Sequence, residues 1–217
     1  MQRSAGIVLI IGSLMFLIGV LTPVMLNVFG NIGNPELQLE YLEKDPTGWD
    51  VSNAVNGAGS LVAAIGLGLF ARQVQSVSNN KNVRMTGYIG AAMAILGALC
   101  WVIISYYRIV LSPEEITNDV GIPNGLYTAY YILTLIALLI SGFVLLRSGY
   151  PKWLGWLVLV LAGLMLVAYL ALGGLPPGVY YPILLVMGIT LVVIKTPQLS
   201  NETGEIKGAV SESATVG

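Results

Sequence analysis

The segment from Asn53 to Ala71, NAVNGAGSLVAAIGLGLFA, decides the fold that we predict for this chain. Small and polar residues recur in it at spacings of three and four, which places them on one face of a helix. In water each glycine inside a helix costs roughly 1 kcal/mol relative to alanine, but in a membrane small residues let two helix backbones approach closely. We therefore interpret the segment as a membrane-spanning helix with a packing face. The members of this face are Asn53, Gly57, Ser60, Ala64, Gly68 and Ala71.

The composition of the whole chain supports an all-α integral membrane protein. Of its 217 residues 56% are hydrophobic and 10% are charged, whereas soluble domains typically have about 25% charged residues. A net charge of −1 gives no basic surface for nucleic acid. The chain has no histidine, and its one cysteine, Cys100, cannot form a disulfide within the chain. We interpret Cys100 as a small apolar residue rather than a reactive thiol.

The distribution of apolar residues predicts six membrane-spanning helices. A span needs about 20 apolar residues to cross ~30 Å of hydrocarbon. Pro23 is expected to bend the first span near its outer end. The uncharged stretch from Trp153 to Ile194 is too long for one crossing, and GGLPPG at Gly173–Gly178 is expected to divide it into a tight hairpin of two spans. The predicted spans are at about 5–30, 51–71, 85–107, 125–146, 153–173 and 178–195.

A short helix at the membrane surface is predicted between the first two spans, within NPELQLEYLEK. Asn34 is a typical capping residue, Pro35 suits the first helical position, and Glu36 places a negative charge in the first turn. The leucines of this segment alternate with acidic residues. The pattern indicates a helix that lies along the surface in the first outer loop rather than one that crosses the membrane.

The third span carries a second stripe of small residues, and we expect it to pack antiparallel against the second span. Such stripes are usually packing faces, and less often line a substrate path. The residues predicted to meet are Gly57, Ser60, Ala64 and Gly68 on one helix and Gly87, Ala91, Ala94 and Ala98 on the other.

The charge distribution predicts the orientation in the cell membrane. With both termini in the cytoplasm, the inner segments hold eight of the 10 lysines and arginines, and only Lys44 and Arg108 lie outside. Eight of the 11 acidic residues then lie outside, and the other three are in the C-terminal tail. Residues 1–196 form the predicted membrane domain, and residues 197–217 form a flexible cytoplasmic tail rich in polar residues.

Catalytic and cofactor-binding patterns are not found in the sequence. No Asp, Glu, Lys or Arg lies deep in a predicted span, which argues against a proton-coupled pump or a voltage sensor. Without histidine the commonest zinc and haem ligands are missing. No nucleophile motif, phosphate-binding loop or dinucleotide fingerprint occurs. We therefore expect a protein that is not an enzyme and has no cofactor or metal.

Polar side chains gather at the predicted outer ends of the second, third and fourth spans, at a similar depth. They could line an outward-facing pocket in which Arg108 binds an anion. The more ordinary interpretation is a belt of aromatic residues at the membrane surface, with Arg108 paired to Asp50 or Asp119. The candidate pocket residues are Asn53, Asn56, Tyr107, Arg108, Tyr127 and Tyr131.

These observations favour an accessory or scaffolding subunit of a larger membrane complex, with membrane lipids and other membrane protein subunits as its partners. The alternative is a transporter or binding protein for a small or lipid-like solute in the Tyr/Asn/Arg pocket. The two differ at Arg108. In a scaffold Arg108 is expected to pair with a carboxylate or a partner, and in a solute-binding protein it is expected to face a cavity.

Overall fold

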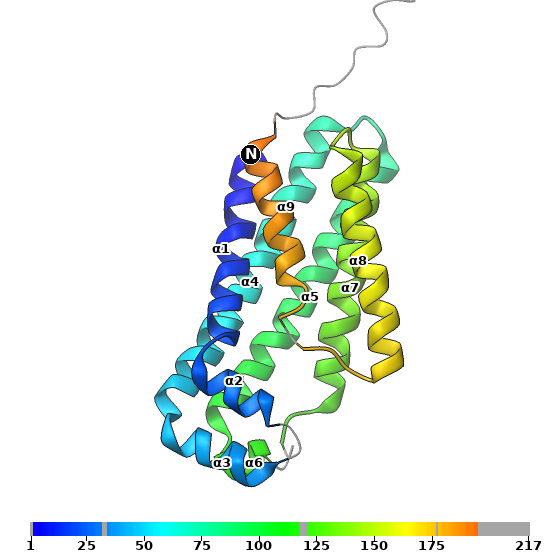
Figure 1. Ribbon diagram of the computed structural model, residues 1–217. Coiled ribbons are helices and arrows are strands. Elements are labelled where there is room, and N and C mark those ends of the chain that lie inside the picture. The colour runs from blue at the N-terminus through cyan, green and yellow to red at the C-terminus, as the bar shows by residue number, and fades with distance from the viewer. Residues whose placement is uncertain (1, 32–33, 118–120, 177, 195–217) are drawn as a thin grey trace, which may run out of the picture.

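The computed structural model describes residues 2–31, 34–117, 121–176 and 178–194, and in these ranges it contains helices and no strand. Five of the helices are long and apolar enough to cross a membrane. Together the helices form an elongated bundle (Figure 1). Their bounds are α1 Gln2–Val20, α2 Pro23–Gly30, α3 Pro35–Lys44, α4 Pro46–Val77, α5 Lys81–Val110, α6 Pro113–Thr117, α7 Asn124–Arg147, α8 Lys152–Leu172 and α9 Tyr181–Val193.

The long helices follow one another as neighbours in space. α1 packs on α4, α4 on α5, α5 on α7, and α7 on α8, so that the predicted pairing of the second and third spans is confirmed. α9 then returns to pack on α1 (Figure 1). Its residues Tyr181 and Leu184 face α4 and α5 across a narrow cleft. On the other side of this cleft lie Ser60, Ala63, Ala64, Leu67, Ala94, Ala98 and Thr134.

The last two apolar segments do not form the expected hairpin. α9 packs mainly on α1 and makes few contacts with α8, and it has only 13 residues. At 1.5 Å per residue it is about 20 Å long, shorter than the ~30 Å of a bilayer core. Residues 178–180 form a turn instead of the first turn of a helix. The structure thus contains five helices of spanning length, and the sixth predicted span corresponds to a short helix that starts partway along the bundle (Figure 1).

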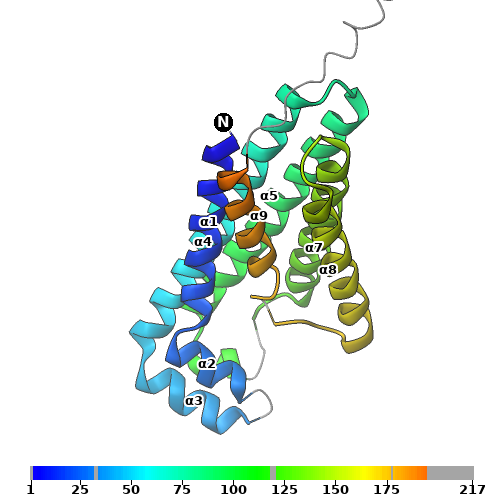
Figure 2. The same ribbon diagram turned by 45° about the horizontal axis from the view of Figure 1, so that its top comes forward.

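The first predicted span changes direction near Pro23 as expected, but it is divided into two helices rather than bent. α1 ends at Val20, and Pro23 starts the separate helix α2. At the break, the hydroxyl groups of Thr22 and Ser52 are hydrogen bonded at 2.8 Å, which joins this corner to α4. The corner directs α2 away from α1 and toward the end of the bundle where α3 lies (Figure 2).

Helices α2, α3 and α6, together with the first turn of α4, form a cap on this end of the bundle (Figure 2). The short helix predicted in this segment is present as α3, and the side chain of Asn34 accepts a hydrogen bond from the Leu37 amide at 3.3 Å. Just before α6, the amide and hydroxyl groups of Ser112 donate to the Glu115 carboxylate, and these bonds hold the pKa of Glu115 below its ordinary value. The cap has an apolar core of its own, made of Val24, Met25, Val28, Leu42 and Trp49.

The second and third helices are longer than the predicted 51–71 and 85–107. The side chain of Asp45 caps α4 by accepting a hydrogen bond from the Gly48 amide at 2.9 Å, so that the helix begins five residues before the apolar run. The polar connector is itself mostly helical. It extends α4 as far as Val77, where Ser78 is the C-cap, and α5 begins at Lys81, where Asn80 is the N-cap. The predicted domain end at residue 196 and the tail 197–217 lie outside the described residues.

The closest helix contact is between α1 and α4. A Cβ atom added to Gly12 would lie 2.3 Å from the Ala63 nitrogen, and one added to Gly59 would lie 2.5 Å from the Phe16 nitrogen. On the face predicted to meet α5, Gly57 does lie against Ser105, with an added Cβ 3.3 Å from the Ser105 Cβ.

The prediction that Gly68 lies at a close contact is wrong. A Cβ added to Gly68 would meet no atom within 4 Å, because its side of α4 does not approach another helix closely. The four small residues of the predicted stripe on α5 have different surroundings. A Cβ added to Gly87 would lie 3.8 Å from Ala71 of α4, Ala91 is buried, and Ala94 and Ala98 line the cleft toward α9.

Candidate functional site

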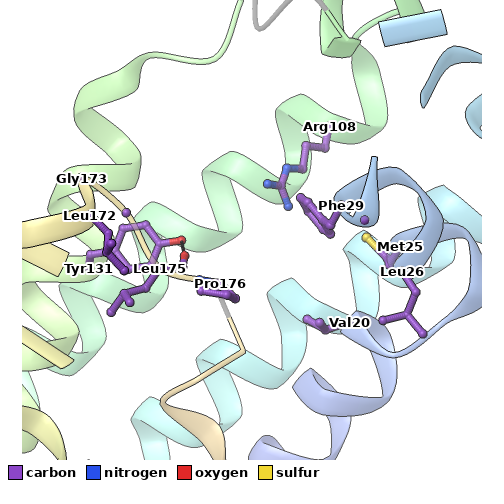
Figure 3. A pocket seen from close by; sticks show the side chains of 12 residues that line it. Val20, Met25, Leu26, Phe29, Arg108, Tyr131, Leu172, Gly173, Leu175 and Pro176 are labelled. Carbon is purple, nitrogen blue, oxygen red and sulfur yellow. Dashed lines mark hydrogen bonds between the residues drawn. The ribbon is translucent and has the colours of Figure 1, made fainter. Parts of the chain in front are cut away.

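A cavity of about 750 Å³ lies at the end of the bundle that carries the cap (Figure 3). Its walls come from parts of the chain that are distant in sequence: the α1–α2 corner, the end of α5, the start of α7 and the segment that follows α8. Figure 3 shows Val20, Met25 and Phe29 on one side of the space and Tyr131 and Leu172 on the other. The lining residues are Val20, Met25, Leu26, Phe29, Gly30, Arg108, Tyr131, Leu172, Gly173, Gly174, Leu175 and Pro176.

The cavity exists because α9 is short. α9 packs beside α1 but begins only at Tyr181, and the non-helical segment 173–176 lines the space beyond its start. Gly173 ends α8 in the left-handed conformation, at a φ of 71°, which glycine adopts without strain. The hydroxyl group of Tyr131 donates a hydrogen bond to the Leu175 carbonyl oxygen and so ties this segment to α7.

Among the described residues that line the cavity, Arg108 is the one that is charged, and it is only 6% exposed. Its guanidinium carbon lies 5.1 Å from the ring centres of Phe29 and Trp101 and 5.6 Å from that of Tyr127. Its Nη2 donates to the Tyr127 hydroxyl at 3.3 Å. The Nη1 atom is buried and has no hydrogen-bond partner within the described part of the chain. The guanidinium therefore still has donors that are not used.

The backbone around Arg108 is held from the cap. The indole nitrogen of Trp49 donates to the Arg108 carbonyl oxygen at 2.8 Å, in a buried hydrogen bond between the start of α4 and the end of α5. Phe29 packs on Trp49 with ring centres 6.3 Å apart. The cap thus positions both Arg108 and one of the rings beside its guanidinium.

The expected ion pair with Asp50 is not formed. Asp50 is exposed, and Arg108 has no hydrogen bond or ion pair with a carboxylate within residues 34–117 or the other described ranges. Asp119, the other expected partner, lies outside the described residues. A buried charge without a counter-charge is costly in apolar surroundings. The aromatic rings reduce this cost but do not supply a negative charge.

The structure brings together three of the six predicted pocket residues. Arg108 and Tyr131 line the cavity, and Tyr127 contacts Arg108 from outside the lining. Tyr107 is part-buried, stands edge-on to Tyr106 and does not line the cavity. The aromatic-belt interpretation is therefore insufficient for Arg108, because its guanidinium lies in the protein interior among aromatic rings.

Asn53 and Asn56 lie in the interior of the bundle, away from this cavity. Asn53 donates to the Trp49 carbonyl oxygen at 2.9 Å and borders a shallow groove between α4 and α5. Asn56 faces α1, where its Oδ1 lies 2.1 Å from the position of a Cβ added to Gly19. The two asparagines were predicted to share the pocket, but they point to different neighbours.

Sequence reasoning missed the apolar partners of Arg108. Trp101 precedes Arg108 by seven residues, which places both on the same face of α5. This spacing is a signal that could have identified Trp101. Phe29 belongs to a different helix, and nothing local in the sequence connects it with Arg108.

Potential metal ligands do not cluster in the part of the chain that the structure describes. The described residues contain no group of three His, Cys, Asp or Glu that could hold a metal ion, and Cys100 is a part-buried free thiol. What the cavity offers chemically is an apolar surface with one cation in it.

The fold defines the class of this protein as all-helical, with five helices of membrane-spanning length and apolar composition. No known protein family, curated protein or solved structure matches the chain.

Proposed function

We propose that this chain is a multi-pass membrane protein that binds a lipid-like solute in the cavity between α2, α5, α7 and the segment 173–176. The observation that carries the proposal is the cavity itself. Its volume of about 750 Å³ is within the ~300–1,000 Å³ range of small-molecule sites. Its lining is mainly aliphatic and aromatic, with one charged side chain at Arg108.

Of the two functions predicted from the sequence, this proposal adopts solute binding rather than scaffolding. The two functions predicted different surroundings for Arg108, and the cavity that Arg108 shares with Tyr131 supports the solute-binding function. A role as an accessory subunit remains a prediction with no observation of its own. The exposed apolar side chains of α8, such as Leu164 and Val167, are explained equally well by contact with lipid.

The membrane location is supported by five apolar helices, and we propose the cell membrane with both termini in the cytoplasm. This orientation rests on the excess of lysine and arginine in the predicted inner segments. It places the cap and the cavity on the outer side.

The orientation can be tested at Asn79, an exposed residue between α4 and α5. In a Cys100→Ser background, Asn79→Cys is expected to react with a membrane-impermeant thiol reagent only after the cells are opened. A cysteine at Glu43, an exposed residue of α3, is expected to react in intact cells. The opposite result at the two positions would reverse the orientation.

The proposed solute binding can be tested by filling the cavity. Gly174 lines it, and a Cβ added there meets no atom within 4 Å, so Gly174→Phe is expected to place its ring in the cavity without disturbing the backbone. We expect acyl probes with neutral or charged headgroups to raise the melting temperature of the wild type in zwitterionic nanodiscs. For the probe that binds best, Gly174→Phe is expected to weaken binding at least about tenfold, which is ~1.4 kcal/mol.

The matched control is Gly163→Phe. Gly163 lies on α8 outside the cavity lining, and an added Cβ there also has open space within 4 Å. This variant is expected to bind the probes like the wild type. Equal binding by Gly174→Phe and Gly163→Phe, or no stabilisation of the wild type by any acyl probe, would show that the cavity is not a lipid-binding site.

A further inference from the structure

We propose that the cavity selects its ligand by headgroup charge, and that it binds an amphiphile with a monoanionic oxyanion headgroup on Arg108 and an aliphatic chain along the apolar walls. The headgroup chemistry is that of a carboxylate or a phosphodiester. This inference rests on the proposed function and narrows it to one class of solute.

The first argument is the hydrogen bonding of the Arg108 guanidinium. The guanidinium lies among three aromatic rings, those of Phe29, Trp101 and Tyr127. Its polar contacts are made by its N–H groups. A guanidinium has five N–H donors, and one contact, from Nη2 to the Tyr127 hydroxyl at 3.3 Å, is formed. The buried Nη1 has no partner among the described residues. In Figure 3 the guanidinium points into the space between the Tyr131 side and the Phe29 side of the cavity.

The second argument is the charge of the cavity. Arg108 carries the only full charge among the described lining residues, and Tyr131 already uses its hydroxyl proton on the Leu175 carbonyl oxygen. One negative charge on the ligand neutralises the site. A dianionic phosphomonoester would leave a surplus charge in apolar surroundings, and a cationic headgroup would repel Arg108. With a neutral headgroup the guanidinium would have no counter-charge from the ligand or from the part of the chain that the structure describes.

The third argument concerns the rest of the ligand. Away from Arg108 the walls are apolar, with Val20 and Leu26 on one side and Leu172 and Pro176 on the other. A free inorganic anion would leave this surface unused. An aliphatic chain attached to the anion covers it and gains the free energy of apolar burial. Arginine suits both headgroups because its planar donors match carboxylate and phosphate oxygens.

The test compares probes that share one chain and differ in headgroup charge. The probes are dodecanoate, methyl dodecyl phosphate, monododecanoylglycerol and dodecyltrimethylammonium, which are two monoanions, a neutral molecule and a cation. Each is titrated against the full chain in zwitterionic nanodiscs, and the signal from Gly174→Phe is subtracted as the background of bilayer partitioning. We expect at least one monoanion to bind the wild type roughly 10- to 100-fold more tightly than the neutral probe.

Arg108→Gln is expected to remove this preference, because glutamine keeps polar N–H groups but loses the charge. The matched control is Arg147→Gln, since Arg147 is exposed at the far end of α7 and lies 5.5 Å from the Phe143 ring. This variant is expected to keep the preference. Preference for dodecanoate alone would point to a free fatty acid, and preference for the phosphodiester alone would point to a phospholipid; both support the inference.

Equal binding of the neutral probe and both monoanions by the wild type would overturn the charge selection and leave the proposed lipid binding intact. Failure of every probe would instead overturn the proposed function. If Arg108→Gln does not fold, the probe series on the wild type still decides between these outcomes.

Discussion

Gly12→Ala is expected to be one of the most destabilising single-methyl substitutions in this chain. The added Cβ would lie 2.3 Å from the Ala63 nitrogen, 2.7 Å from the Ala63 Cα and 2.9 Å from the Gly59 carbonyl oxygen. All three atoms belong to the backbone of α4, which cannot move aside as the end of a side chain can. α1 and α4 would have to separate along their length, and we expect a loss of at least ~1–3 kcal/mol. The measurement is thermal unfolding of the protein in a mild neutral detergent.

The control for this prediction is Gly68→Ala. It adds the same methyl group to α4 at a position where no atom lies within 4 Å. Since alanine is the better helix former by roughly 1 kcal/mol in water, the variant is expected to be as stable as the wild type or slightly more stable. A loss at Gly68 equal to that at Gly12 would contradict the α1–α4 contact described above.

The comparison of Gly12 with Gly68 also shows what sequence periodicity can predict. The start of α3 and the pairing of α4 with α5 follow from local patterns, namely Asn34–Glu36 and the small-residue stripes. α4, however, has small residues on more than one face. The face containing Gly59 and Ala63 meets α1 more closely than the predicted face meets α5. A small residue permits a close contact, but which helix approaches it depends on the packing of the whole bundle.

The candidate site could be predicted only in part, and the physical reason is similar. Hydropathy places residues at a depth along each helix, and Arg108, Tyr127 and Tyr131 do lie together. Depth does not determine the direction of a side chain around the helix axis, and Asn56 points toward α1 instead. The start of α9 at Tyr181 was not predicted either, because the preceding apolar residues are equally compatible with a helix.

Phe16→Ala is expected to destabilise the interior and to impair the cavity. Phe16 is fully buried, and its ring stacks on Tyr181 with centres 3.7 Å apart and planes inclined by 11°. It also packs on Trp101, with ring centres 5.5 Å apart. Truncation of a buried phenylalanine typically costs ~3–5 kcal/mol, since it removes apolar contacts and leaves a void. The melting temperature is therefore expected to fall well below that of the wild type.

The consequence for binding follows from the two partners of Phe16. Tyr181 is the first residue of α9, whose short length leaves room for the cavity, and Trp101 is one of the rings beside Arg108. Loss of the Phe16 ring releases both, so the affinity for the acyl probes is expected to fall at temperatures where the variant is still folded. Phe143→Ala is the control, because Phe143 is 40% exposed on α7 and is expected to change stability and binding little. Unchanged binding by folded Phe16→Ala would mean that the aromatic interior does not support the cavity, and that Arg108 is held in place by the cap alone.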